Sequence, residues 1–277
     1  MSEGILAAKI SEEDKTLYLQ KKNACQKIMD EIKGKETNLL LMVRDYPEEA
    51  PIAHLALANE MLNLTLCQLK IDNISNTHLG TQNEEALAEG RKNIVKSLGY
   101  LENVVTDFVD APFSEYEDNL VKIASFDESQ RFHLVEKMGK TIGQLKEAYG
   151  NQSKWKWSFV ELDGRFAAVA KNILDLKKAV ENTDPRSPYY EPTVRHLQTV
   201  KELLTRAAER YREKYEMSTN QIDDFRKGIN FLRSLFRIHT LTGRKDEAAE
   251  VKKKHAIWAA KLETDIKNKK ARGETVQ

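Results

Sequence analysis

The second half of the chain has the most regular pattern of hydrophobic and polar positions. Between Lys154 and Glu181, large apolar residues recur at alternating steps of three and four, the spacing of one apolar seam along an α-helix. The same spacing recurs in residues 192–211, 222–239 and 248–262. This half is therefore predicted to form four long amphipathic helices. The seam of the first one consists of Phe159, Leu162, Phe166, Val169, Ile173, Leu176 and Val180.

Residues that end or cap helices separate these segments. Residues 182–192 contain three prolines and are predicted to form a linker-like turn, because proline interrupts helical hydrogen bonding. Ser218, followed by Gln221 three positions later, matches the spacing of a capping box. Gly243 is expected to end the third helix, since glycine readily adopts the left-handed conformation found after helix C-termini.

The first half is less regular, but the same signals predict helices. Gly34 is expected to end the first helix, and the polar residues 72–82 are expected to form a loop. Asn83 is expected to cap a helix whose seam runs from Ile94 to Phe108. The other helices predicted in this half are 11–33, 36–46, 51–70, 114–126 and 128–149.

Together these patterns predict an all-α protein. Gly and Pro number only 12 and 6, as expected for a chain made mostly of helix interiors. No alternating run typical of a β-strand competes with the helical pattern. We expect long antiparallel helices in an up-and-down bundle or in an elongated array that resembles a helical repeat protein.

Charge divides the chain into two regions. Residues 1–150 hold 17 basic and 25 acidic side chains, a net charge of −8, whereas residues 151–277 hold 27 and 18, a net charge of +9. We therefore predict an acidic N-terminal helical region (1–150) and a basic C-terminal one (151–277), which could still form one continuous domain. Opposite charges of this kind can steer a partner or favour head-to-tail self-association.

One helical hairpin resembles a known family. In the segment Leu-Phe-Arg-Ile-His-Thr-Leu-Thr-Gly-Arg-Lys-Asp-Glu-Ala-Ala-Glu-Val, Leu235, Gly243, Glu247 and Ala248 stand where a tetratricopeptide repeat has its first-helix Leu, its turn Gly and the Glu-Ala that opens its second helix. The resemblance covers about residues 232–256 and implies two helices joined at Gly243. No period near 34 residues continues along the chain.

Motifs for catalysis, metals and cofactors are absent from the sequence. Gly139–Thr141 reads Gly-Lys-Thr, but residue 134 is Leu where a phosphate-binding loop needs Gly. His239 and His255 fall on apolar seams at different heights of neighbouring helices, so we interpret them as seam histidines satisfied by hydrogen bonds. We therefore expect a protein that is not an enzyme and that needs no cofactor or metal.

Nucleic acid and membranes are not expected partners. Trp155 and Trp157 alternate with lysines, but two residues apart on a helix they face different directions, and we interpret them as core or helix-start anchors. The net charge of +1 also argues against a general nucleic-acid binder. No apolar run could span a membrane, and the acidic N-terminus does not resemble a signal peptide. We expect a cytoplasmic protein, with a processed secreted form left open.

These observations favour a non-enzymatic helical scaffold or adaptor that binds another protein, which could be acidic. One alternative is a structural subunit of an oligomer or filament assembled through the opposite charges of its two halves. A further alternative is a ligand-binding or enzymatic helical bundle. Because arginine is frequent at interface hot spots, we predict a basic protein-binding strip in the C-terminal region, made of Arg226, Arg233, Arg237 and Arg244.

Overall fold

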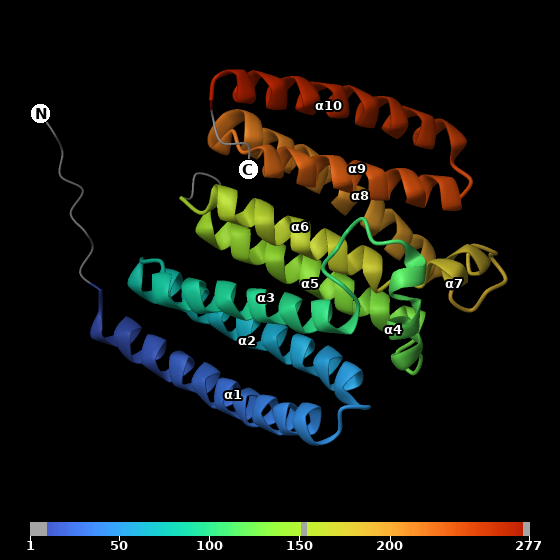
Figure 1. Cartoon of the computed structure of the whole chain (residues 1–277). Coiled ribbons are helices and arrows are strands. Elements are labelled where there is room, and N and C mark those ends of the chain that lie inside the picture. Colours follow the sequence, from blue (N-terminus) through green and yellow to red (C-terminus); the bar gives the residue numbers. More distant parts are fainter. Residues whose placement is uncertain (1–9, 151–153, 274–277) are drawn as a thin grey trace, which may run out of the picture. The chain divides into compact units, whose positions relative to one another are not determined.

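The computed structural model describes residues 10–150 and 154–273, and within these ranges it contains helices and no strand (Figure 1). The all-α, antiparallel helical fold predicted from the sequence is confirmed. Residues 1–9, which include most of the segment tested for a signal peptide, lie outside the described residues. The helices are α1 (Glu12–Asp45), α2 (Ala50–Leu79), α3 (Glu84–Val104), a 3₁₀ turn (Phe113–Glu115), α4 (Glu117–Lys122), α5 (Glu128–Tyr149), α6 (Lys156–Asn172), α7 (Leu176–Glu181), α8 (Tyr190–Lys214), a π-helical turn (Tyr215–Thr219), α9 (Ile222–Leu241) and α10 (Lys245–Ala271).

The chain divides into two compact units. Unit 1 comprises residues 1–97 and 140–151, and unit 2 comprises residues 98–139 and 152–277. The division crosses α3 and α5, so both helices contribute one part to each unit. The predicted regions 1–150 and 151–277 differ in net charge. Their division into separate domains stays a prediction.

Unit 1 is built on an antiparallel hairpin of two long helices, α1 and α2 (Figure 1). Its interior contains the thiol-bearing residue Cys25, and Cys67 on α2 is half-buried; both are free thiols. On its other side α2 packs against α3, where Ser97 Oγ donates a hydrogen bond to Ala58 O at 2.8 Å and Thr65 Oγ1 donates one to Gly90 O at 3.3 Å. Both buried hydroxyls therefore have a hydrogen-bond partner, as polar groups inside a helix–helix contact need.

Two predictions about unit 1 are wrong. The helix expected to stop at Gly34 continues to Asp45, where Pro47 excludes a helical conformation for the residue before it. The expected loop at 72–82 is instead the last part of α2, which ends at Gly80 with a φ of +64°. Asp72 misled the sequence interpretation because it is buried: its Oδ1 accepts a hydrogen bond from Asn83 N at 2.7 Å and so caps the start of α3. The predicted cap by Asn83 itself is confirmed by its bond from Ala86 N at 2.9 Å.

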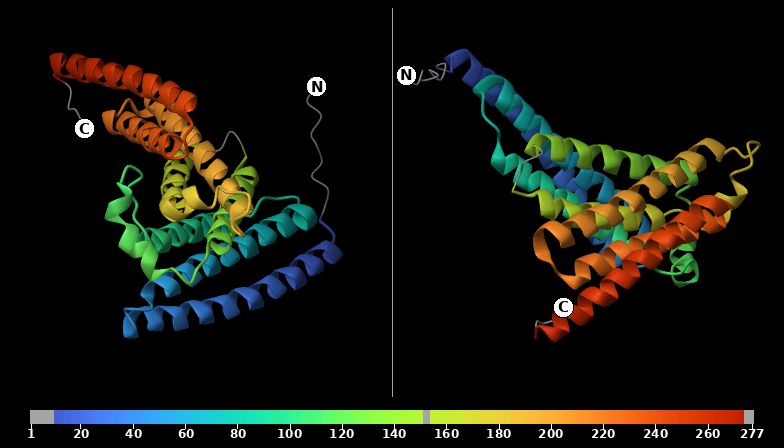
Figure 2. Two further views of the ribbon diagram at one scale, coloured as in Figure 1. Left: turned by 90° about the vertical axis from the view of Figure 1, so that its right-hand side faces the viewer. Right: turned by 90° about the horizontal axis from the view of Figure 1, so that it is seen from above.

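In unit 2 the helices follow one another in hairpins. Helix α8 packs against α6 and α9, and α9 packs against α10 (Figure 2). Aromatic side chains fill the contacts: Tyr211 stacks on Phe231 with ring centroids 5.5 Å apart, and Tyr215 stacks on Phe225 at 5.0 Å. Stacked aromatic pairs add to the stabilisation that apolar burial provides.

The bounds predicted for α5 are confirmed, whereas three other predictions in this unit are wrong. The single helix expected at 154–181 breaks after Asn172, and Asp175 caps the short α7 that follows. The expected helix at 114–126 is a 3₁₀ turn followed by the six-residue α4. Ser218 does not cap α9, because the chain forms a π-helical turn at 215–219 and then a left-handed residue at Asn220.

Two glycines inside helices predict opposite effects of the same substitution. Gly34→Ala is expected to raise the free energy of unfolding by up to about 1 kcal/mol, because Ala favours a helix and open space surrounds this position. Gly164→Ala is expected to lower it by about 1–3 kcal/mol, since the new Cβ would lie 2.6 Å from the ring of the buried Tyr211. Urea denaturation of both variants measures the contrast, and equal effects would contradict the close packing at Gly164.

In the part of the chain that the structure describes, none of the helices combines the length and apolar character needed to cross a lipid bilayer.

Candidate functional site

The loop between α3 and the 3₁₀ turn is fixed by side chains that bind its backbone carbonyls. From α6, Asn172 Nδ2 donates hydrogen bonds to Thr106 O and Phe108 O at 2.9 and 3.2 Å, and Lys171 Nζ donates one to Ala111 O at 3.0 Å. From α9, Ser234 Oγ donates to the neighbouring carbonyl of Val109. These hydrogen bonds satisfy the carbonyls of the loop and hold its backbone against α6 and α9.

Two of the four arginines predicted to bind a partner form ion pairs with this loop. Arg233 Nη1 lies 2.7 Å from Asp110 Oδ2, and Arg237 Nη1 lies 2.9 Å from Asp110 Oδ1 and 2.7 Å from Asp110 O. These two arginines thus converge on one carboxylate of their own chain. Both side chains are still partly exposed.

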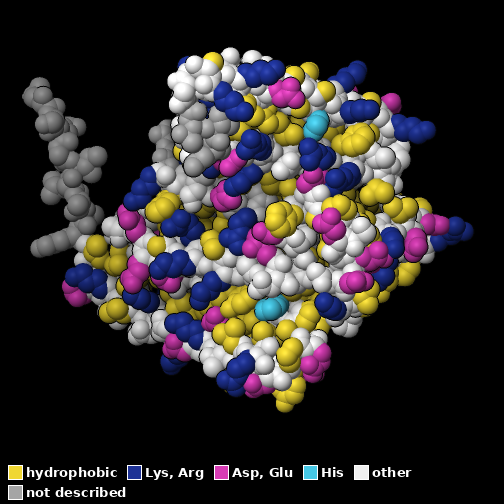
Figure 3. Space-filling model, in the orientation of Figure 1, with side chains coloured by type: hydrophobic (Ala, Val, Ile, Leu, Met, Phe, Trp, Pro, Cys, Tyr) yellow, Lys and Arg dark blue, Asp and Glu magenta, His cyan; other side chains and the backbone are white. Residues whose placement is uncertain are grey.

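The other two predicted arginines have different acidic partners. Arg226 pairs with Asp223 at 2.7 Å on the same helix, and Arg244 lies at the turn before α10, 4.0 Å from Glu247. Figure 3 shows basic and acidic side chains interspersed over the face in view. Each of the four arginines thus has an acidic partner within its own chain, and Arg244 also lines a groove described below, while a binding role for the four stays a prediction.

Lys171 is the most deeply buried amine of this loop contact. It is 2% exposed, and its Nζ lies 4.9 Å from the centre of the Tyr116 ring. Burial, with a smaller contribution from the nearby charge of Arg237, lowers the pKa of Lys171 to about 8, while Asp110 opposes the shift. A lowered lysine pKa can mark a reactive amine, but this amine is committed to the carbonyl of Ala111, so we interpret it as structural.

A cleft of about 480 Å³ lies beside this loop, and we call it the Tyr211 cleft. Four of its charged side chains are paired with one another. Arg165 makes two hydrogen bonds of 2.7 Å to the carboxylate of Glu102, and Lys227 lies 3.1 Å from both carboxylate oxygens of Glu161. Tyr211 Oη donates a further bond to Glu161 at 2.9 Å. Polar groups satisfied inside the chain leave this cleft little unused capacity to hold a charged ligand.

A second depression, of about 610 Å³, lies between α7, α8, the end of α9 and the start of α10. We call it the α8–α9 groove. Three of its apolar lining residues are accessible to solvent: Val180 is 46% exposed, Tyr190 37% and Leu241 49%. The lining residues are Val180, Thr183, Tyr190, Val194, Leu197, Gln198, Lys201, His239, Leu241, Thr242, Arg244 and Glu247.

The lining of this groove also includes basic side chains, Lys201 and Arg244, and the imidazole of His239. Burial lowers the pKa of Lys201, and the nearby Arg244 lowers it further. Burial also lowers the pKa of His239, with Lys201 as the next cause. Glu247 acts in the opposite direction on both groups. The groove thus combines an accessible apolar surface with positive charge that its single lining carboxylate only partly balances.

The two seam histidines are not both satisfied as the sequence predicted. His239 Nδ1 and His255 Nε2 are buried and have no hydrogen-bond partner among the described residues. Burial lowers the pKa of His255 as well. Within the same residues, no three or more His, Cys, Asp and Glu side chains are grouped in a way that could hold a metal ion.

Trp155 and Trp157 lie at the start of α6. Trp155 is its N-cap residue, and both side chains are partly buried. The neighbouring lysines lie over these rings, with Lys156 Nζ 4.5 Å from the centre of the Trp157 ring. Their cation–π contacts are therefore made within the chain.

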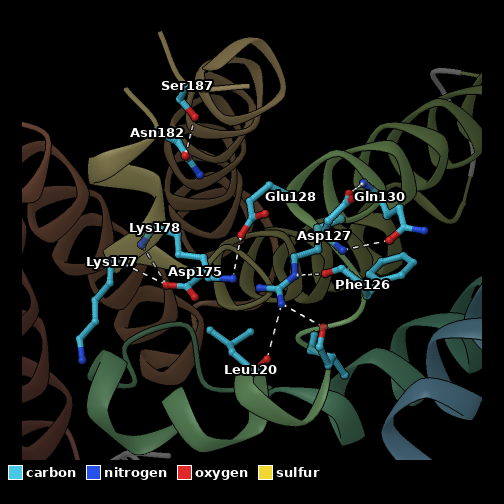
Figure 4. A network of polar contacts seen from close by, with 12 residues as sticks. Leu120, Phe126, Asp127, Glu128, Gln130, Asp175, Lys177, Lys178, Asn182 and Ser187 are labelled. Carbon is cyan, nitrogen blue, oxygen red and sulfur yellow. Dashed lines mark hydrogen bonds and ion pairs between the residues drawn. The ribbon is translucent and has the colours of Figure 1, made fainter. Parts of the chain in front are cut away.

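A buried polar network joins α4, α5, α6 and α7 (Figure 4). At its centre Arg131, 1% exposed, donates to the carbonyls of Phe126 at 2.7 Å and Ile123 at 3.1 Å, with longer contacts to Leu120 O and Ile173 O. The buried Glu128 lies 3.3 Å from Lys178. Because Arg131 satisfies carbonyls at the C-terminal ends of α4 and α6, we interpret the network as structural.

Comparison with known proteins gives one match. A family model described as the TP0443 family matches residues 14–266, which is most of the chain. The chain belongs to the TP0443 family. No curated protein and no solved structure matches it. The tetratricopeptide-like hairpin of this TP0443 family member is present as α9 and α10, joined at Gly243 with a φ of +70°, while its assignment to that repeat family stays a prediction.

The sequence interpretation of this TP0443 family member missed most of the α8–α9 groove. Tyr190 and Lys201 lie at distant positions of α8 and Leu241 lies at the end of α9, and no local motif unites them. A weak signal existed on α8, where Val194, Leu197, Gln198 and Lys201 repeat at steps of three, one and three and so share one helix face. A lysine that continues an apolar stripe on a helix can indicate a half-buried surface, because its carbon chain packs on apolar groups while its ammonium group reaches water.

Proposed function

We propose that this protein is a non-enzymatic helical scaffold or adaptor and that it binds another protein at the α8–α9 groove of unit 2. The observation that carries the proposal is the groove itself, about 610 Å³ in volume, with solvent-accessible Val180, Tyr190 and Leu241 in its lining. Exposed apolar side chains gathered in a concavity, with charged groups beside them, are typical of sites that bind peptides or helices.

The rigidity of the surrounding helices supports this proposal. Helices α8 and α9 are 25 and 20 residues long, and the aromatic stack of Tyr211 on Phe231 holds them together. A platform of packed helices presents a groove with little loss of conformational entropy on binding. The charges of the Tyr211 cleft, in contrast, are already engaged within the chain.

Site-specific photocrosslinking tests the proposal. We expect a photoreactive phenylalanine analogue at Leu241 to give discrete adducts with one or a few proteins in a lysate of the native host. The control position is Met217, which is 73% exposed and lies at the opposite end of the α8–α9 hairpin.

The adducts at Leu241 should disappear when unlabelled protein is added in excess, because a specific site saturates. Adducts that form equally at Leu241 and Met217, or none at Leu241, would contradict a binding role for the groove.

A further inference from the structure

The ammonium group of Lys201 is the feature of the α8–α9 groove that the protein itself leaves unused. Lys201 lies on α8 and is half-buried in the groove wall. Among the described residues, no hydrogen bond or ion pair joins its Nζ to another group. Many of the other partly buried basic side chains of unit 2 have such a partner, as in Lys227 with Glu161 and Lys254 with Glu209. A half-buried cation without a partner is costly, so an incoming anion would be favoured there.

Arg244 and His239 are two further groove residues that favour an incoming anion. Arg244 lines the groove from the turn before α10, and its ion pair with Glu247 is long, at 4.0 Å. His239 lines the groove from α9, and its Nδ1 is buried without a hydrogen-bond partner. The positive charges of Lys201 and Arg244 disfavour each other, and a bound carboxylate would relieve that repulsion.

The apolar lining residues limit what kind of anion fits. Val180, Tyr190 and Leu241 are exposed in the same groove as Lys201 and Arg244. A fully polar anion such as inorganic phosphate would leave that apolar surface in water. A peptide segment that carries a carboxylate next to an apolar side chain would cover both kinds of surface, so it gains burial and charge pairing together.

We propose that the α8–α9 groove binds an acidic segment of a partner protein in which a carboxylate adjoins an apolar side chain. The carboxylate pairs with Lys201 and Arg244, and the apolar side chain packs on Tyr190 and Leu241. This inference rests on the proposed function and deepens it by stating the chemistry of the partner. The carboxylate can come from an Asp or Glu side chain or from the C-terminus of the partner chain.

Peptide display against the full-length protein tests the proposal. Two random twelve-residue libraries are selected in parallel, one with a free C-terminal carboxylate and one whose peptides are fused at that end to the display protein. We expect enriched peptides with an acidic group within two positions of Leu, Ile, Phe or Met. Enrichment from the first library alone identifies the C-terminal carboxylate as the source, and enrichment from the fused library identifies a side-chain carboxylate.

Variants then connect the peptides to the groove. For the most enriched peptide, synthesised with a fluorescent label, Lys201→Gln should weaken the Kd about tenfold or more, as expected when a charge-assisted hydrogen bond is lost. Lys201→Arg should largely restore binding. Lys245→Gln is the matched control, because Lys245 is an exposed lysine of the same basic turn that does not line the groove. Melting temperatures of all three variants verify that they fold.

The outcomes separate the two proposals. Enriched peptides without acidic residues, or equal weakening by Lys201→Gln and Lys245→Gln, would overturn the carboxylate inference while leaving peptide binding intact. Failure to enrich any peptide, together with the absence of adducts at Leu241, would overturn the proposed function and this inference with it.

Discussion

Replacing Arg131 with Met is expected to lower the free energy of unfolding by about 3–5 kcal/mol. Arg131 is 1% exposed and donates to carbonyls of Ile123 and Phe126, close to the end of α4, and to Ile173 at the end of α6. Met has a similar length but no donor, so these buried carbonyls would lose their partner. Each buried polar group left without a partner costs about 1–3 kcal/mol.

Charge adds to the expected cost of this substitution. Burial lowers the pKa of Arg131, and the carboxylates of Glu128 and Asp175 oppose that shift. Glu128 is itself buried, so removing the guanidinium leaves its negative charge with less compensation. Removing one member of a buried ionic network is among the most destabilising single changes.

Arg186→Met provides the control for this prediction. Arg186 is also ion-paired, with Asp184, but its side chain is 90% exposed in the turn between α7 and α8. Exposed pairs contribute about 0–1 kcal/mol, so this variant should unfold almost as the wild type does. The measurement is urea denaturation followed by circular dichroism at neutral pH. A loss below about 1 kcal/mol for Arg131→Met would show that the network is not needed for the fold.

Acidification is expected to remove about 3 kcal/mol of stability through His196 alone. His196 lies on α8, is fully buried, and donates from Nε2 to Ala170 O at 2.9 Å. That carbonyl lies in the last turn of α6, where the N–H of Leu174 bonds to Lys171 O instead. Burial lowers the pKa of His196 from 6.5 to about 4.

The direction of the effect follows from the proton each state binds. Below pH 6.5 the unfolded chain protonates His196, whereas the folded chain keeps it neutral until about pH 4. The unfolded state therefore gains stability as the pH falls through this window. The contribution of His196 is fully present above pH 6.5 and is lost progressively between pH 6.5 and 4.

A comparison of two variants isolates this contribution from that of other acid-titrating groups. The free energy of unfolding of wild type, His196→Gln and His133→Gln is measured from pH 7.5 to pH 4.5. We expect His196→Gln to have a lower stability at pH 7.5 and a shallower decline below pH 6.5. His133 is exposed, so His133→Gln should retain the wild-type slope. Identical slopes for all three proteins would contradict the assignment.

The ends of α5 and α1 show how far local sequence signals decide where a helix stops. The bounds of α5 were predicted correctly because Gly150, with a φ of +78°, stops the helix locally. Gly34 was expected to act in the same way, yet α1 continues through it. A glycine inside a helix costs only about 1 kcal/mol, and the packing of α1 along α2 exceeds that cost. Local chemistry allowed both outcomes, and the tertiary contact selected one.

The partners of the four predicted binding arginines also could not be predicted from local sequence. The four arginines were chosen because they recur along one helix and the turn after it, but their partners could not be read from that pattern. Asp110, which pairs with Arg233 and Arg237, lies 123 positions from Arg233. The identity of this acidic partner depended on the path of one loop.

By itself, the sequence determined that this protein is all-α, where several of its helices begin and end, and that a hairpin turns at Gly243. These properties depend on side-chain period, capping and backbone preference, which act over a few neighbouring residues. Only the tertiary structure decided that Asp72 is buried and that Arg131 donates hydrogen bonds to carbonyls at the ends of two helices. It also decided that Tyr190, Lys201 and Leu241 line one groove. These are contacts between distant segments, and they follow from the packing of whole helices rather than from any local spacing.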